Sequence, residues 1–204
     1  MRLFSVLNQR LWQPYLRALD SYPLVTKSLS TAALMGTGDV IAQRLEYHYK
    51  SPSERMKTKG FEVDVRRALT MTGVGAFFSG PLLHFWYKRL DILVRGEGAL
   101  VVVKKLALDQ LAFAPVVISA FIGLMGTLNG KTPSQCIQAI QNDLFFALKA
   151  NWTLWPLANA INFALIPPSL RVLYVSTVSV FWNIFLSNLG NKKHDEGSTT
   201  SSSS

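Results

Sequence analysis

Five long apolar stretches alternate with polar joints along the chain. They cover Pro23–Leu45, Ala68–Leu90, Leu106–Leu128, Leu144–Pro167 and Leu170–Leu189. Each has enough residues to cross the roughly 30 Å hydrocarbon layer of a bilayer as a helix that rises about 1.5 Å per residue. The pattern therefore predicts an all-α integral membrane helical bundle, with four transmembrane helices plus a further interfacial or fifth membrane helix.

The joints between these stretches carry turn and capping residues. Residues 46–67 form a charged loop, and the RGEG sequence at 95–98 is typical of a tight turn. Thr132 followed by Pro133 predicts the start of a helix, with Thr as the N-cap and Pro at its first position. The pair Pro167-Pro168 separates the last two stretches.

The two ends of the chain differ from this central part. Residues 1–22 contain three arginines before the first acidic residue and have an amphipathic pattern, typical either of a mitochondrial transit segment or of a retained helix in the membrane interface. Aromatic and apolar anchors favour the retained helix: Trp12, Tyr15 and Leu16. We expect a membrane bundle over 23–189 and a disordered polar tail over 190–204.

Small residues recur four apart inside three of the stretches. The pairs are Ala32/Gly36, Ala76/Gly80 and Ser119/Gly123. This spacing places both members on one helix face, where they let two backbones approach closely. Close packing matters in lipid because burying leucine against leucine brings no gain there.

Composition supports a membrane protein and excludes several other classes. Hydrophobic residues make up 49% of the chain and charged residues 16%, and the net charge is +9. The basic residues lie in the joints, which is typical of anionic lipid and span flanks and not of a nucleic-acid surface. The single cysteine, Cys136, excludes an internal disulfide and a cysteine zinc site. We find no catalytic motif, and we expect no enzyme activity, no cofactor and no metal.

Asp109 and Gln110 stand inside the third stretch, in the sequence LALDQLAFAP. A charged residue at the centre of a membrane helix costs about 2.5–3.5 kcal/mol on insertion scales. Asp109 could pair with Lys105 four residues earlier, at the interface, or it could face a polar interior together with Gln110. Pro115 should leave the carbonyl group of Leu111 without its helical partner.

Asp39 poses the same problem in the first stretch. Gln43 follows it by one turn, whereas Lys27 lies twelve residues earlier, about 18 Å away by helical rise. Asp39 must therefore find a partner on another segment, become protonated or meet water.

The fourth stretch carries a stripe of polar residues. At 100° per residue, Asn151, Trp155, Asn159 and Asn162 fall within about 80° of one another, opposite a face of leucine, isoleucine and alanine. Such a stripe is typical of a hydrogen-bond network between helices, which we slightly favour, or of an aqueous path.

The residues just described also resemble a known family. The matching segments are 12–43, 64–91, KKLALDQLAFAP at 104–115, MGTLNGK at 125–131 and NWTLWPLANAINFALIPPSLRVLYVSTVSVFWNIFLS at 151–187. They resemble the Mpv-seventeen family of small mitochondrial inner-membrane and peroxisomal membrane proteins, and most nearly its fungal mitochondrial stress-inducible member. The resemblance implies four spans, which leaves the fifth stretch as the interfacial helix, and links to metabolic stress and mitochondrial DNA maintenance.

These observations predict a multi-pass protein of the mitochondrial inner membrane or, alternatively, of the peroxisomal membrane. The leading hypothesis is a small channel or metabolite carrier, and the alternative is a non-conducting scaffold or assembly factor. Expected partners are the lipid bilayer, a second copy or a larger inner-membrane complex, and small metabolites, without direct contact to nucleic acid. Eight residues are candidates for lining a pore or forming a polar network: Asp39, Asp109, Gln110, Asn151, Trp155, Asn159, Asn162 and Arg171.

Overall fold

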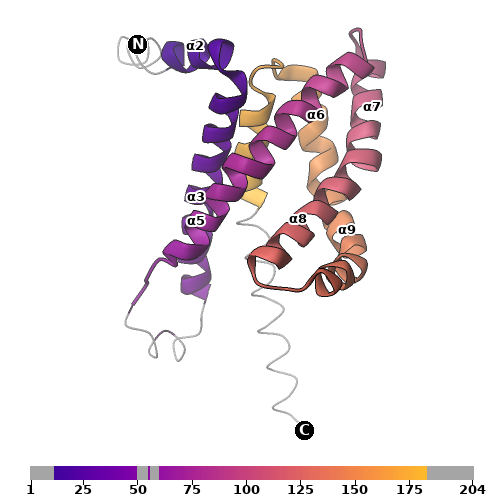
Figure 1. Ribbon diagram of the computed structural model, residues 1–204. Coiled ribbons are helices and arrows are strands. Elements are labelled where there is room, and N and C mark those ends of the chain that lie inside the picture. The colour runs from indigo at the N-terminus through magenta and orange to yellow at the C-terminus, as the bar shows by residue number, and fades with distance from the viewer. Residues whose placement is uncertain (1–11, 50–54, 56–59, 183–204) are drawn as a thin grey trace. The chain divides into compact units, whose positions relative to one another are not determined.

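The computed structural model describes residues 12–49, 55 and 60–182, and every regular element within them is helical (Figure 1). This confirms the predicted all-α class. The chain divides into two compact units, residues 1–86 with 168–204 and residues 87–167, and the boundary between them falls inside one helix. Each unit is described by itself below.

The first unit begins with α2 (Gln13–Ser21), which packs on the long helix α3 (Pro23–Tyr49). Tyr22 breaks the helical conformation between them, with φ −136° and ψ 62°. Leu19 is buried, and the Tyr15 hydroxyl lies 3.2 Å from Ser30 Oγ. The predicted amphipathic segment 1–22 is thus helical from residue 13, and residues 1–11 lie outside the described part.

The second long helix is built from three elements: α5 (Val65–Val74), the π-helical turn η2 (Gly75–Ser79) and α6 (Gly80–Leu93). Asp64 caps its start by accepting a hydrogen bond from the Arg67 backbone N–H at 2.9 Å. The helical residues 65–93 contain the predicted stretch 68–90 and extend it by three residues at each end. The charged loop is shorter than predicted, because α3 continues to Tyr49.

Glycines bring this helix and α3 into backbone contact. A Cβ atom at Gly75 would lie 2.7 Å from Ala32 Cα, and one at Gly80 would lie 2.6 Å from Ser28 Cα. The contacts run antiparallel, since the later glycine meets the earlier residue of α3. We predicted the pair Ala76/Gly80; the close pair is Gly75/Gly80, because in η2 the Gly80 N–H bonds to the Gly75 carbonyl, five residues back.

A shorter apolar helix, Arg171–Trp182, completes the described part of the first unit. It packs on α3, where Ser176 Oγ and Thr31 Oγ1 lie 2.9 Å apart and both residues are buried. Pro167 and Pro168 precede it outside any helix, as predicted. Residues 183–189 of the fifth predicted stretch, and the tail 190–204, lie outside the described residues.

The second unit contains the most apolar helix, formed by α7 (Ala99–Leu108), the π-helical turn η3 (Asp109–Phe113) and α8 (Ala114–Leu128). Among the described residues, Ala99–Leu128 is the helix long and apolar enough to cross a membrane. It starts seven residues before the predicted stretch 106–128. The structure therefore supports one span directly, and the count of four is not confirmed.

The helix α9 (Pro133–Leu165) runs antiparallel to α8. Thr132 and Gln135 form a capping box at its start, as the Thr-Pro sequence predicted. The closest approach is at Gly126, where an added Cβ would lie 2.8 Å from Cys136 Sγ. At Gly123 of the predicted Ser119/Gly123 pair, the nearest atom is an ordinary 3.6 Å away, in Ile140.

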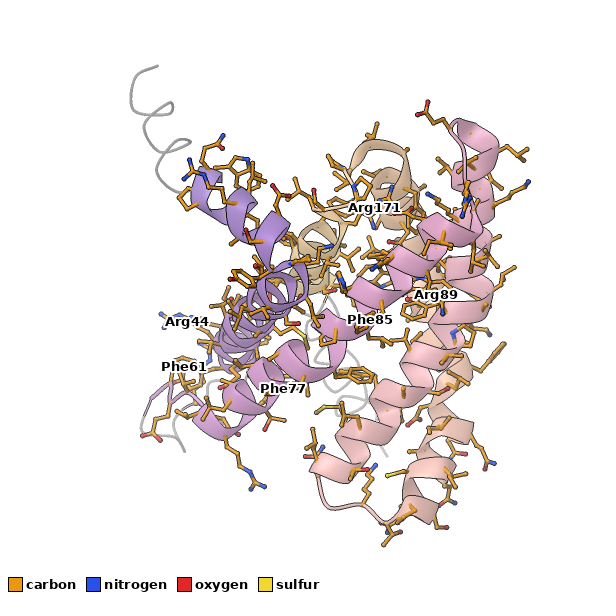
Figure 2. All side chains as sticks on the ribbon, turned by 45° about the horizontal axis from the view of Figure 1, so that its top comes forward. Arg44, Phe61, Phe77, Phe85, Arg89 and Arg171 are labelled. Carbon is orange, nitrogen blue, oxygen red and sulfur yellow. The ribbon has the colours of Figure 1, made fainter. Side chains whose placement is uncertain are left out.

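Large apolar side chains cover the outer faces of these helices. Phe77 is 87% exposed and Phe85 is 55% exposed. Figure 2 shows both side chains on the long helix formed by α5, η2 and α6. A face of this kind is costly in water but natural in lipid, where outward apolar groups touch acyl chains.

Candidate functional site

A buried polar cluster lies where the third long helix meets α9 in the second unit. Asn159 Nδ2 and Gln110 Nε2 donate to Asp109 Oδ2, at 2.7 Å and 2.8 Å. Asn151 Nδ2 donates to Gln110 Oε1 at 3.0 Å. We call these four residues the Asp109 cluster. They tie η3 to α9 through side-chain amides.

The π-helical turn explains why two neighbouring residues of η3 both face inward. The Ala114 N–H bonds to the Asp109 carbonyl, so this turn contains one residue more than an α-helical turn. Asp109 and Gln110 are 4% and 6% exposed. The widened turn ends at Phe113, two residues before Pro115, so the helix accommodates the proline by changing its hydrogen-bond pattern and not by a break.

The alternative of an Asp109–Lys105 pair at the interface is wrong. Lys105 Nζ instead contacts Asp91 Oδ1 at 2.6 Å. Because the helix begins at Ala99, Asp109 lies ten residues inside it, about 15 Å by helical rise, or a third of the way along its 30 residues. Asp109 therefore faces a polar interior together with Gln110, which was the other interpretation.

Asn162 lies one turn after Asn159 and is fully buried, at 0% exposure. Neither its Nδ2 nor its Oδ1 has a hydrogen-bond partner within the described part of the chain, and Asn159 Oδ1 has none there either. Trp155 is half-buried on the same helix. The predicted apolar face is mostly exposed, as at Leu157 and Leu165, although Ala158 is buried.

A second polar cluster lies in the first unit, between the end of α3 and the start of α5. Arg67 Nε contacts Asp39 Oδ1 at 2.8 Å, and its two terminal nitrogens contact the Glu46 carboxylate at 2.8 Å and 3.0 Å. Gln43 Nε2 donates to Asp39 Oδ2 at 2.7 Å. We call Asp39, Gln43, Glu46, Asp64 and Arg67 the Arg67 cluster. Asp39 has thus found its partner on another segment.

Gln43 joins the two helices through the backbone as well. Its Nε2 donates to the Asp64 carbonyl at 3.1 Å, and the Asp64 N–H donates to its Oε1 at 2.7 Å. Arg67 stands just before the predicted apolar stretch, and three of its guanidinium nitrogens contact the two carboxylates at 2.8–3.0 Å. Arg67 therefore holds both Asp39 and Glu46.

The sequence analysis missed Arg67, Glu46 and the Lys105–Asp91 pair. A signal for the Arg67 cluster was present, because residues 39, 43 and 46 follow an i, i+4, i+7 pattern that places them on one face of α3. A polar stripe of this kind with two acids needs a cation from another element. Arg171, the last predicted residue, is buried at the start of its helix in the first unit (Figure 2).

The described residues contain no group of three or more His, Cys, Asp or Glu side chains arranged to hold a metal ion. What both clusters offer is hydrogen bonding and charge. The Asp109 cluster and Asn162 add buried amides, which can bind polar groups without changing protonation.

Comparison with known proteins identifies relatives along nearly the whole chain. A model of the Mpv17 / PMP22 family matches residues 126–187. PXMP2/4 family protein 2 of Dictyostelium discoideum is 49% identical over 185 residues, which cover 91% of this chain and 93% of the relative. No solved structure matches.

Two further relatives indicate the membrane. Mitochondrial inner membrane protein Mpv17 of Homo sapiens is 37% identical over 178 residues, covering 87% of this chain and 96% of the relative. Peroxisomal membrane protein 2 of Bos taurus is 34% identical over 184 residues, covering 90% and 91%. Both predicted locations, the mitochondrial inner membrane and the peroxisomal membrane, are those of these relatives, whereas the fungal affinity stays a prediction. The chain is a membrane protein and belongs to the Mpv17 / PMP22 family.

Proposed function

We propose that the protein is a small channel or carrier that lets polar metabolites cross its membrane beside α9. In this proposal four helical segments span the bilayer: α3, the helix over 65–93, Ala99–Leu128 and the C-terminal part of α9. The path runs along the contact between α9 and the third of these helices, within the second unit.

A column of polar side chains supports this path. Along the two antiparallel helices, Asn151 meets Gln110 and Asn159 meets Asp109, and Asn162 follows on the same side of α9. From Asn151 to Asn162 the column rises eleven residues, about 16 Å, or roughly half of the 30 Å hydrocarbon layer. Polar groups at this depth are costly, and in membrane proteins they commonly mark solute or ion pathways.

The single observation that carries the proposal is the incomplete hydrogen bonding of this column. Three buried amide atoms of Asn159 and Asn162 have no partner within the described residues. A network that only holds helices together should satisfy its polar atoms, since each buried, unmade hydrogen bond costs about 1–3 kcal/mol. Atoms left open in this way are satisfied when water or a passing solute is present.

The alternative is a non-conducting scaffold or assembly factor, and one observation favours it. The Asn159–Asp109 and Asn151–Gln110 contacts are complete hydrogen bonds between different helical elements, as expected for structural links. If the protein is a scaffold, Asn159→Leu should weaken its helix packing. The same variant should have no effect on transport.

A flux assay on the purified protein in liposomes tests the proposal. Wild-type protein should release small polar solutes, and Asp109→Asn should change the rate or the charge preference of release. Asp143→Asn is the matched control, because Asp143 is an exposed carboxylate on α9. Absence of any flux from the wild-type protein, in liposomes where it is correctly inserted, rejects the channel and leaves the scaffold.

The proposal has consequences beyond the path itself. The protein catalyses no reaction and needs no cofactor, and its partners are the bilayer, small metabolites and a second copy or a larger inner-membrane complex. Effects on metabolic stress and on mitochondrial DNA maintenance then follow from the passage of solutes, without contact to nucleic acid.

A further inference from the structure

We propose that Asn162, together with Asn159 Oδ1, is the binding site for a hydroxyl group in the path, either water itself or the hydroxyl of a neutral solute. This inference rests on the proposed function and names the group that the path accepts. Asn162 is fully buried, and its amide donor and its amide acceptor are both open within the described residues.

The chemistry of the open atoms selects the ligand. Asn162 Nδ2 donates, whereas Asn162 Oδ1 and Asn159 Oδ1 accept, so the site needs a group that can do both. A hydroxyl group or a water molecule does so and is uncharged. The charged group of Lys105, on the neighbouring helix α7, is already held by Asp91, and the atoms without a partner at this site belong to neutral amides.

Asn162 also lowers the stability of the fold, which a purely structural role would not explain. A leucine in the place of Asn162 would remove two buried polar atoms without a partner, a change that is neutral or stabilising when the polar group makes no hydrogen bond. Keeping an asparagine there is consistent with a function that trades stability for binding.

Two variants of equal shape test the assignment. Asn162→Thr keeps a hydroxyl that donates and accepts, whereas Asn162→Val replaces it by a methyl group. We expect liposome flux of the polyol erythritol to be about tenfold lower for Asn162→Val than for Asn162→Thr, which corresponds to one hydrogen bond of about 1.4 kcal/mol. Asn142→Val, at an exposed position of α9, should match the wild-type protein.

The possible outcomes separate the two sources and the two proposals. A difference in both erythritol flux and osmotic water flux assigns the site to passing solutes, and a difference in water flux alone assigns it to water. Equal fluxes for Asn162→Val and Asn162→Thr, in a protein that conducts, overturn the Asn162 assignment and leave the channel intact. Absence of flux in the wild-type protein overturns both.

We infer, from separate contacts in the first unit, that the helix Arg171–Trp182 is inserted in the membrane beside α3, that the chain crosses the membrane there, and that this helix does not lie in the interface. Thr31 meets Ser176, and a Cβ at Gly38 would lie 3.1 Å from Val180 Cγ2. Residue numbers rise together in these two contacts, so the two helices run parallel.

The depth of the contacts supports a membrane-spanning position. Thr31 and Gly38 follow Pro23, the first residue of α3, by eight and fifteen residues, or about 12 Å and 22 Å along the helix axis. A helix lying flat in the interface would meet α3 only near one of its ends. The outward Phe181 is 67% exposed, as expected for a lipid contact. This inference replaces the expectation of an interfacial fifth helix.

Five crossings place the C-terminal tail on the side opposite to α2. The lone cysteine makes this easy to test, because Cys136→Ala supplies a cysteine-free background. In it, single replacements Arg17→Cys, Glu97→Cys, Lys131→Cys and Ser201→Cys are labelled with a membrane-impermeant maleimide in sealed vesicles, and all four should label in detergent. We expect position 201 to label from the same side as 131.

Two labelling results would contradict the five-span arrangement. Labelling of position 201 from the side that labels 17 and 97 means an even number of crossings and overturns the inference. Labelling of 17 and 97 from different sides overturns the underlying alternation of the first helices, and the five-span arrangement with it. Neither result bears on flux, so the proposed path is judged independently.

Discussion

The Arg67 cluster and the Asp109 cluster solve the same physical problem in different ways. Each places a buried carboxylate on a long apolar helix, with exposed fractions of 7% for Asp39 and 4% for Asp109. In the first, a guanidinium binds two acids at once, through three nitrogens. In the second, two amides from different elements donate to one carboxylate oxygen.

This difference separates a structural joint from a candidate path. Charge-assisted contacts with a guanidinium are strong and directional, and a passing molecule cannot easily replace them. Neutral amides exchange partners with water and solutes at lower cost. The backbone packing differs as well: in the first unit Gly75 and Gly80 meet backbone atoms of α3, whereas in the second unit the closest glycine contact, at Gly126, is with a side-chain atom, Cys136 Sγ.

The largest expected effect is at the glycine contact of the first unit. Gly75→Val should destabilise the protein by about 3 kcal/mol or more, because the new side chain would overlap backbone atoms of α3 that cannot move aside. Thermal unfolding of the purified protein in detergent measures the change. Gly73→Val is the control, since nothing lies within 4 Å of a Cβ at that position.

The second effect tests the Arg67 cluster. Arg67→Met should destabilise by about 2 kcal/mol, below the 3–5 kcal/mol of a fully buried pair, because the Arg67 side chain is 39% exposed. Arg66→Met, at the exposed neighbour, should have little effect. Equal melting temperatures for the two variants would show that the cluster does not join the helices, and the contrast drawn above would fail.

The third effect concerns the Asp109 cluster and should be smaller. Asn159→Leu should cost about 1 kcal/mol, in the range of interhelical hydrogen bonds in membranes. A double-mutant cycle with Asp109→Asn measures how much of this cost belongs to the pair. A loss as large as that for Arg67→Met would make the Asp109 cluster a structural joint as well, and would favour the scaffold.

Much of the helical pattern could be predicted from the sequence, because apolar length, caps and prolines act locally. Thr132 and Pro133 marked the start of α9 correctly, and Pro167-Pro168 marked its end. The third long helix begins seven residues before the predicted stretch and includes Lys104 and Lys105. Lys105 is in fact buried against Asp91, a contact between distant residues that no local pattern reveals.

The candidate site was predictable only in part, for the same reason. The amide stripe on α9 follows from helical periodicity, and the structure brings two of its members to Asp109 and Gln110. The two π-helical turns could not be foreseen, since they arise where close packing against a neighbour competes with regular hydrogen bonding. They set which residue faces inward, Gly75 instead of Ala76 and Gln110 as well as Asp109.

The smallest expected effect is at the Lys105–Asp91 pair. This pair is the contact in the second unit that fits the contrast between the two clusters least well. Both residues belong to the second unit, but their contact is an ion pair, like those of the Arg67 cluster. Because the Asp91 side chain is 30% exposed, solvent and salt should screen the pair, and its coupling energy should be only about 0.5 kcal/mol.

A cycle of Lys105→Met, Asp91→Leu and the double variant measures this coupling in detergent at low and high salt, with Lys104→Met as the exposed control. A small coupling energy that decreases with salt means that the pair is accessible to solvent and lies outside the column of amides. A salt-independent coupling of about 2 kcal/mol or more would place a dry ion pair beside the path. The second unit would then depend on charge as much as the first does, and amides would no longer distinguish the two.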